Sequence, residues 1–242
     1  MTMKKILIIS GKEMRQFFDS LIAYILLTGF LGFSGFFTWL YGGDVFLVGQ
    51  ASLQTFFAIA FWTLFFFIPA LTMRMIAEER RSGTIETLMT KPVTAWQVVL
   101  GKFLATLLLV MIALMLTLPY YFTISGIGKI DHGAVISGYL GLVLMSAVYI
   151  SIGLFASSIS GNQIVGFLLA LLISLFFHIL FDLLSSAFSG ALAEIFYYLS
   201  MSSHFESISR GVIDSKDLLY FLILTFLGLV LTHHRLTRSQ AV

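Results

Sequence analysis

The sequence has no cysteine and very little charge. None of its 242 residues is cysteine, which excludes disulfides and thiol chemistry and leaves the redox compartment undefined. Charged residues make up 11% of the chain, whereas soluble domains carry about 25%. The formal net charge of +2 is too small to indicate a nucleic-acid partner. The scarcity of charge therefore argues against a soluble domain and favours a protein that lies in a membrane.

Motifs for catalysis and metal binding are also missing. The nearest match to a nucleotide-binding loop is Gly11-Lys12, which is followed by glutamate where the motif requires serine or threonine. No two histidines show a metal-ligand spacing such as H-x-x-x-H. His178 and Asp182 are four residues apart and are expected to share a helix face, where we favour pairing or solvation over a proton or metal role. The sequence thus predicts no catalytic residue, metal site or cofactor in this chain.

Long apolar runs make up most of the chain. Hydrophobic residues account for 59% of it, and the runs are continuous and not alternating, which favours helices over a β-barrel. The predicted spans are residues 21–41, 54–73, 103–124, 134–157, 164–184 and 218–232. The last of these is short, about 23 Å at the rise of an α-helix. The expected fold is an all-α membrane protein with six transmembrane helices.

An additional helix is predicted before the first span. Residues 2–19 are amphipathic at about 100° per residue, which is typical of a helix that lies in the membrane interface. Ile6 and Phe17 are on its apolar side and Lys12 is on its polar side, but Glu13 departs from the pattern. The alternative is a plain polar leader to the first span.

Local signals refine the ends and contacts of the spans. Thr94 to Gln97 fits a capping box, so the helix that leads into the third span should start near Ala95. The fourth span carries Gly138, Gly141 and Gly153, which allow close approach of a neighbouring helix. Ordinary glycine usage in membrane helices is the alternative.

The densest polar stretch, residues 77–92, separates the second and third spans. Its four consecutive charges would cost roughly 10 kcal/mol at the centre of a bilayer, so the stretch must lie in water. Gly83 permits a sharp reversal of the chain, and Thr84 can cap a short helix with Glu86 near its positive end. Pro92 then ends that helix. The pattern predicts a short helix bounded at both ends, and the alternative is a charged loop that only anchors topology.

A second polar region, residues 185–217, precedes the sixth span. Its apolar piece is too short to span, which predicts one or two short helices at the outer face. Acidic residues gather on that side, and they form either a solvated rim or a surface for a cationic substrate or a partner: Asp44, Asp131, Glu194, Glu206, Asp214 and Asp217.

The distribution of lysine and arginine predicts the orientation. Four of the 14 lie in the amino-terminal segment, five lie in or beside the stretch 77–92, and two lie in the carboxy-terminal tail. The three on the opposite side are Lys129, Arg210 and Lys216. The positive-inside rule therefore predicts that both termini and the stretch 77–92 are cytoplasmic.

Two stretches resemble a known family. The run from Ala77 to Leu88, followed by Thr90-Lys91-Pro92-Val93, resembles the segment after the second span in ABC-2-type transporter permeases. Residues 202–214 resemble a segment that some of these permeases carry before their last span. The similarity is closest to the gliding-motility-associated permease subunit and its relative in nitrous oxide reductase maturation. It covers essentially the whole chain as a single transmembrane domain, residues 1–242.

The resemblance implies a half-transporter of the type V ABC exporter architecture in the bacterial cytoplasmic (inner) membrane. Two six-helix subunits would pair as a homodimer or a heterodimer, each docked on a separate ATPase chain that binds ATP and magnesium. Residues 1–19 would be the interfacial helix, residues 77–92 the cytoplasmic coupling region, and residues 185–217 the short outer-face helices. Membrane lipid and a periplasmic or auxiliary membrane protein are further expected partners.

The same resemblance nominates two sets of residues. Those expected to couple the chain to the ATPase are Glu78, Glu79, Arg80, Gly83, Thr84, Glu86, Leu88 and Pro92. Those expected to contact a substrate or partner at the outer face are Glu194, His204, Glu206, Arg210 and Asp214. Two other functions stay open: a subunit that passes motion to periplasmic or motility proteins without moving a solute, and a channel or ion-coupled carrier without ATP. The spans suit lipids or polymers and equally suit plain packing, so the substrate is left open.

Overall fold

The computed structural model describes residues 2–41, 51–83 and 93–238, and every regular element in these ranges is a helix. In chain order they are α1 (Thr2–Asp19), α2 (Ile22–Trp39), α4 (Gln54–Thr72), α5 (Ala77–Arg81), α7 (Ala95–Met115), α8 (Leu118–Ile127), α9 (His132–Ile159), α10 (Gln163–Leu175), the π-helix η1 (Phe176–Leu180), α11 (Phe181–Ala187), α12 (Ala191–Leu199), α13 (Met201–Ser209) and α14 (Ser215–Arg238).

Six helical segments of the described chain are long and apolar enough to cross a membrane, which confirms the predicted six-span fold. They are Ile22–Trp39, Gln54–Arg81, Ala95–Ile127, His132–Ile159, Gln163–Ala187 and Ser215–Arg238. The sixth helix extends beyond the short predicted span, residues 218–232, at both ends. α14 has 24 residues because polar residues at both ends continue the helix beyond its apolar run.

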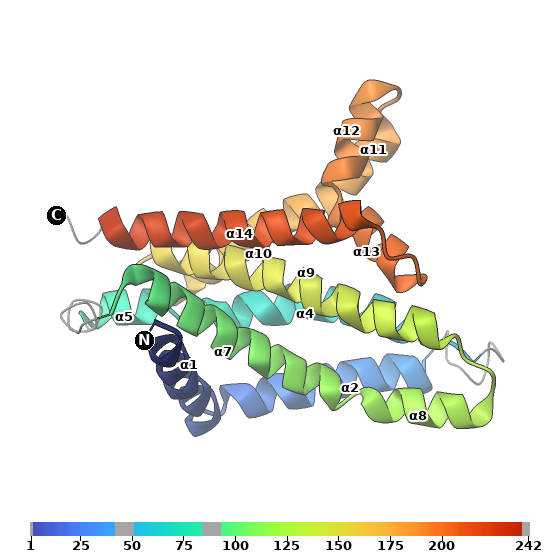
Figure 1. Ribbon diagram of the computed structural model, residues 1–242, viewed down its shortest axis with the longest axis horizontal. Helices are drawn as coiled ribbons and strands as arrows, with labels where there is room; N and C mark the ends of the chain where they lie inside the picture. The colour runs from blue at the N-terminus through green and yellow to red at the C-terminus, as the bar shows by residue number, and fades with distance from the viewer. Residues whose placement is uncertain (1, 42–50, 84–92, 239–242) are drawn as a thin grey trace.

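The long helices lie side by side along the long axis of the molecule (Figure 1). Both ends of the described chain, together with α1 and α5, lie at one end of this bundle, which we call the terminal end. The connection between α8 and α9 lies at the other, distal end (Figure 1). α9 is the central helix, since it packs against α4, α7, α10, α13 and α14.

Two glycines of α9 let its neighbours approach closely. A Cβ at Gly138 would lie 2.4 Å from the ring of Phe57, and a Cβ at Gly153 would lie 1.9 Å from Oγ1 of Thr72. Both contacts are with α4, so the expected role of these glycines is confirmed. The start of α7 is also as predicted: the Thr94 hydroxyl accepts a hydrogen bond from the backbone N–H of Gln97, and Oε1 of Gln97 accepts one from the backbone N–H of Thr94, which completes the capping box.

His178 lies in the π-helix η1 of the fifth span and pairs with Tyr149 of α9, so the predicted pairing of His178 with Asp182 is wrong. His178 is buried, with its Nδ1 2.5 Å from the hydroxyl of Tyr149 and its ring stacked on Phe61 and Phe65. Asp182 is exposed, as the alternative of solvation expected.

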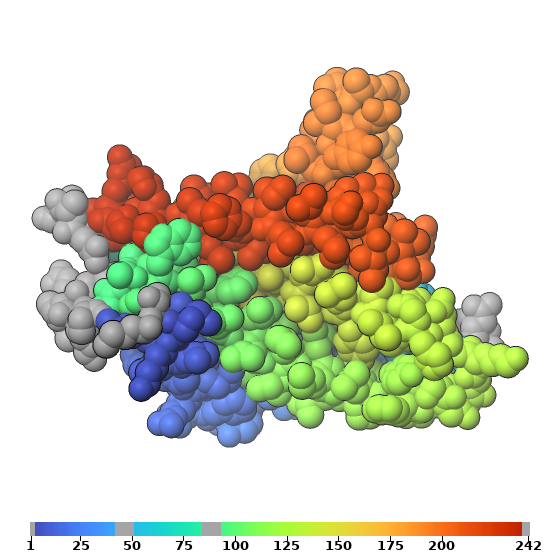
Figure 2. Space-filling view, in the orientation of Figure 1, coloured from blue at the N-terminus to red at the C-terminus, as the bar shows by residue number. Residues whose placement is uncertain are grey.

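The chain leaves the bundle at the end of the fifth span as a helical hairpin. α11 and α12 have no buried residue and project away from the other helices near the distal half of the molecule (Figures 1 and 2). Gly190 begins α12 with a φ of +68°, a left-handed conformation that glycine adopts at little cost. α13 then packs back on α9. The region expected to hold one or two short helices therefore holds two, α12 and α13, after the end of α11.

Candidate coupling site

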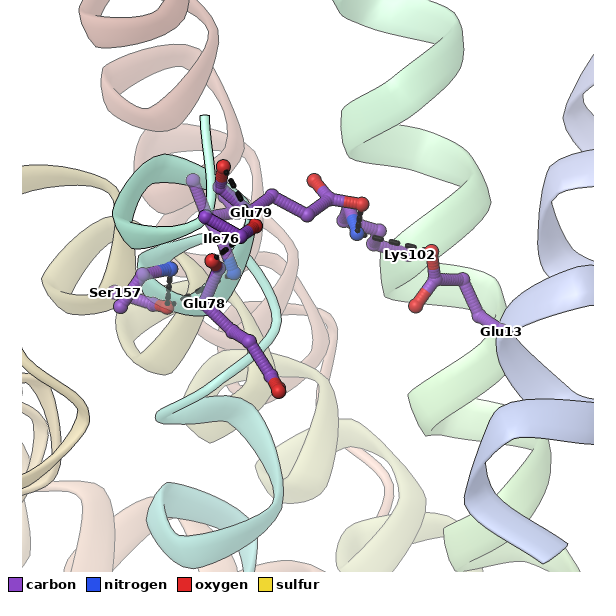
Figure 3. A network of polar contacts seen from close by, with 8 residues as sticks. Glu13, Ile76, Glu78, Glu79, Lys102 and Ser157 are labelled. Atoms are coloured by element: carbon purple, nitrogen blue, oxygen red, sulfur yellow. Dashed lines mark hydrogen bonds and ion pairs between the residues drawn. The ribbon is translucent and has the colours of Figure 1, made fainter. Parts of the chain in front are cut away.

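The helix of the second span is interrupted just before the predicted coupling region. α4 ends at Thr72 and α5 begins at Ala77, and such a break leaves backbone groups without helical partners. Ser157 of α9 satisfies three of them. Its hydroxyl accepts from the N–H of Ile76 at 3.1 Å and of Ala77 at 3.0 Å, and it donates to the carbonyl of Met73 at 2.9 Å. A single serine thus fixes the direction in which α5 leaves α4 (Figure 3).

α1 is held against the first half of α7. Ile6, Ile9 and Phe17 are buried, while Leu7 is exposed, so one face of the helix meets the protein. The closest approach is at Gly101, where a Cβ would lie 2.6 Å from Cγ2 of Ile9. The apolar side that was expected to face lipid therefore packs in part against α7.

A buried ion-pair cluster joins α1, α5 and α7. Nζ of Lys102 lies 2.9 Å from Oε1 of Glu13 and 2.9 Å from Oε1 of Glu79 (Figure 3). The exposed fraction of the side chain is 1% for Lys102, 7% for Glu13 and 18% for Glu79. We call these three residues the charged junction.

The charged junction has a physical consequence for motion. Removing one partner from a buried ion pair leaves an uncompensated charge and costs about 3–5 kcal/mol. Lys102 therefore resists any displacement that would draw Glu13 or Glu79 away from it. The two carboxylates are on different helices, so Lys102 links α5 to both α7 and α1.

A polar cleft of about 540 Å³ opens beside the charged junction. One side of the cleft is formed by α1. The other side is formed by α5 and by the turn that connects α4 to α5. Its lining includes Lys12, Asp19, Arg74 and Glu78. Arg74 spans the cleft by donating from Nη2 to the hydroxyl of Ser20 at 3.0 Å. Charges of both signs line the cleft, which suits it to a charged segment of a protein partner.

The sequence-predicted coupling residues fall into two groups. Glu78, Glu79 and Arg80 are in α5, where Glu78 is exposed and Glu79 enters the charged junction. Gly83 follows with a φ of +70°, which fits the predicted chain reversal. The remaining predicted residues lie outside the described residues: Thr84, Glu86, Leu88 and Pro92.

Glu13, Lys102 and Ser157 were not predicted as site residues. Lys102 was counted only as a flanking charge, and its partners are 89 and 23 residues away in sequence. The sequence contained one signal for this site, because Glu13 is an acidic residue that does not lie on the polar side of the amphipathic pattern. An acidic residue on the face that α1 buries requires a buried partner.

The outer-face residues do not form one site. His204 is buried, with Nδ1 2.6 Å from Oδ1 of Asp217 and Nε2 3.0 Å from the carbonyl of Tyr198. These contacts tie α13 to α14 and to the end of α12. The expectation of a solvated acidic rim is wrong for Asp217, because this carboxylate is buried beside the imidazole.

Of the other outer-face residues, Glu194, Glu206 and Arg210 are exposed and Asp214 is half-buried. Glu206 of α13 forms an ion pair with Arg210, which directly follows that helix. The pKa of Asp214 lies below its ordinary value because the backbone N–H and the side chain of Lys216 both donate to it. Glu194 lies apart from these on α12 of the projecting hairpin. Among the described residues, no three histidine, aspartate or glutamate side chains gather in a way that could hold a metal ion.

Comparison with known proteins identifies the family. A search of curated proteins found no match. The family model described as "ABC-2 family transporter protein" matches residues 34–239, which include all but the first helix and part of the second. This family match and the six segments able to cross a membrane together show that the chain is a multi-pass membrane protein. The chain therefore belongs to the ABC-2 transporter family of membrane permeases.

Proposed function

We propose that this chain is the membrane-spanning permease subunit of an ATP-driven ABC transporter and that a separate ATPase chain drives it. Membership of the ABC-2 family and the absence of a nucleotide-binding loop from the sequence support this. ATP and magnesium bind to the ATPase chain. The terminal end of the bundle faces the cytoplasm, as the distribution of lysine and arginine favours, and the transporter contains two permease subunits.

The charged junction is the observation that carries the proposed mechanism. Residues 77–92 receive the motion of the ATPase, and Glu79 is at their start. Lys102 holds Glu79 and Glu13 at equal distances of 2.9 Å. A displacement of α5 therefore moves α7 and α1 together with α4. Conformational changes of the ATPase are in this way passed to three helices from a single contact.

Paired glycine substitutions test the coupling role. Gly83→Val places a β-branched residue at a φ of +70°, which such residues avoid. Gly161→Val is the matched control at the terminal end, since Gly161 has open space around it and no positive φ. We expect both variants to reach the membrane and only Gly83→Val to lose the co-purified ATPase or its coupled hydrolysis. Retention of both properties by Gly83→Val would overturn the proposed role of residues 77–92.

A second function is favoured by the projecting hairpin. The subunit then transmits nucleotide-driven motion to a periplasmic or motility protein and moves no solute, as in gliding motility or periplasmic maturation. The hairpin exposes Leu192, Ile195, Tyr197 and Tyr198, each with about half of its surface accessible.

Reconstituted complexes distinguish the two functions. Stimulation of ATP hydrolysis by a lipid or polymer in liposomes without any third protein supports export. Co-purification of a periplasmic protein that is lost when Leu192→Ser and Tyr197→Ser are combined supports transmission of motion.

A further inference from the structure

A large hollow lies at the distal end, away from the coupling site. It has a volume of about 1080 Å³ and lies between α4, the start of α9 and α13. Its floor is apolar and includes the buried rings of Phe57, Phe61 and Phe205. We call it the distal cleft.

The rim of the distal cleft carries both signs of charge. Lys129 and Arg210 are cationic, and Asp131 and Glu206 are anionic. Glu206 and Arg210 pair with each other. Within the described chain, Lys129 has no hydrogen-bond or ion-pair partner, and the second carboxylate oxygen of Asp131 is also free, since Oδ1 alone accepts from the amides that it caps.

An apolar groove of about 400 Å³ lies beside the distal cleft, between α2 and α4. Trp62 contributes to the lining of both hollows. Its lining is aromatic and includes Phe33, Phe37, Phe66 and Phe67. The groove is on the membrane-spanning part of these helices, so a chain lying in it is in contact with the bilayer interior.

These features together match one class of ligand. We propose that the distal cleft and groove bind a phospholipid with a phosphoethanolamine head group, taken from the leaflet at the distal end of the bundle. The Lys129 ammonium binds the phosphate, and the free Asp131 oxygen accepts a hydrogen bond from the primary ammonium. One acyl chain lies along the groove past Trp62.

Charge complementarity selects this head group over the alternatives. A rim with two cations and two anions gives no net preference for an anionic head group such as phosphoglycerol. A phosphocholine head group lacks an N–H, so it cannot donate to Asp131. The binding site is separate from the charged junction and does not depend on the ATPase.

Native mass spectrometry tests the proposal with three defined probes. The purified full-length protein is exchanged into an equimolar mixture of phosphatidylethanolamine, phosphatidylcholine and phosphatidylglycerol with identical acyl chains, and the retained lipid is identified. We expect the wild type to prefer phosphatidylethanolamine by about fivefold, the scale of one exposed charge interaction.

Three variants complete the experiment. Lys129→Gln removes the unpaired cation, and Ala58→Trp fills the cleft from an exposed position on α4. We expect each to reduce retained phosphatidylethanolamine by about fivefold or more. Lys216→Gln is the matched control, because this exposed distal lysine pairs with Asp214 outside the cleft.

Several results would overturn the proposal. Equal retention of the three lipids by the wild type, or a preference for phosphatidylglycerol, contradicts the assigned head group. Unchanged retention in Ala58→Trp contradicts the site. A loss in Ala58→Trp without a loss in Lys129→Gln contradicts the role of the rim, and an equal loss in Lys216→Gln shows a non-specific effect of charge.

Discussion

At the residue scale, two polar side chains determine how the coupling region is attached. Lys102 is nearly inaccessible and lies between two carboxylates, and Ser157 fills the break between α4 and α5. Both are buried polar groups, which cost stability unless they are fully paired. Lys102 binds two carboxylates and Ser157 binds three backbone groups, so these two side chains help to specify the geometry of this end of the bundle.

Replacement of Lys102 tests the charged junction. Lys102→Met leaves Glu13 and Glu79 without their shared cation, and we expect a loss of about 3–5 kcal/mol in the free energy of unfolding. Denaturant unfolding in detergent micelles measures it, with the exposed Lys216→Met as the control. Adding Glu13→Gln and Glu79→Gln to Lys102→Met should recover most of the loss, and a triple variant as unstable as the single one would contradict the pairing.

Replacement of Ser157 tests the support of the helix break. Ser157→Ala leaves two N–H groups and one carbonyl without this partner, and we expect a destabilisation of about 1–3 kcal/mol. Ser158→Ala is a close control, because the hydroxyl of Ser158 is also buried but bonds only to the carbonyl of Phe155 in its own helix. Equal stability of the two variants would show that Ser157 does not support the break.

At the element scale, α1 acts as part of the bundle. It packs on α7 at Gly101 and contributes Glu13 to the charged junction. In a helix that lies in the membrane interface without protein contacts, a carboxylate on the apolar face would have no partner and would cost stability. The position of α1 is therefore linked to that of α5.

A small change at Gly101 tests this attachment. Gly101→Ala would place a Cβ 2.6 Å from Ile9 and 3.3 Å from the carbonyl of Ile6, so α1 must shift away from α7. We expect faster hydrogen exchange in α1 by about tenfold, the effect of about 1.4 kcal/mol. Gly126→Ala in α8 is the control, since nothing lies within 4 Å of that position. Exchange in α1 that is unchanged by Gly101→Ala would contradict the packing.

The spans and the capping box at Thr94 could be predicted because each depends on residues near one another in sequence, and the close approaches at Gly138 and Gly153 because the glycines themselves mark them. The charged junction could not, since it pairs Lys102 with residues on two other helices. The partner of His178 was missed for a related reason. Tyr149 is on another helix, 29 residues away in the sequence, and no local pattern marks this contact.

At the scale of the whole molecule, the two ends of the bundle differ. The terminal end gathers α1, α5 and the end of α14, where His233 stacks on Trp96 of α7. The distal end carries the cleft and the exposed hairpin. α9 connects the two ends, through Ser157 at the terminal end and its contact with α13 at the other, as the proposed transmission of motion requires.

The most direct test of the central claim is a site-specific cross-link. The chain has no cysteine, so Glu86→Cys and Lys216→Cys each introduce a single attachment point for a photo-activated cross-linker. In membranes from the native host, we predict that position 86 captures a chain with a nucleotide-binding loop, identified by mass spectrometry, and that position 216 does not. Capture of no such ATPase at position 86, or equal capture at both positions, would contradict the claim that a separate ATPase drives this subunit through residues 77–92.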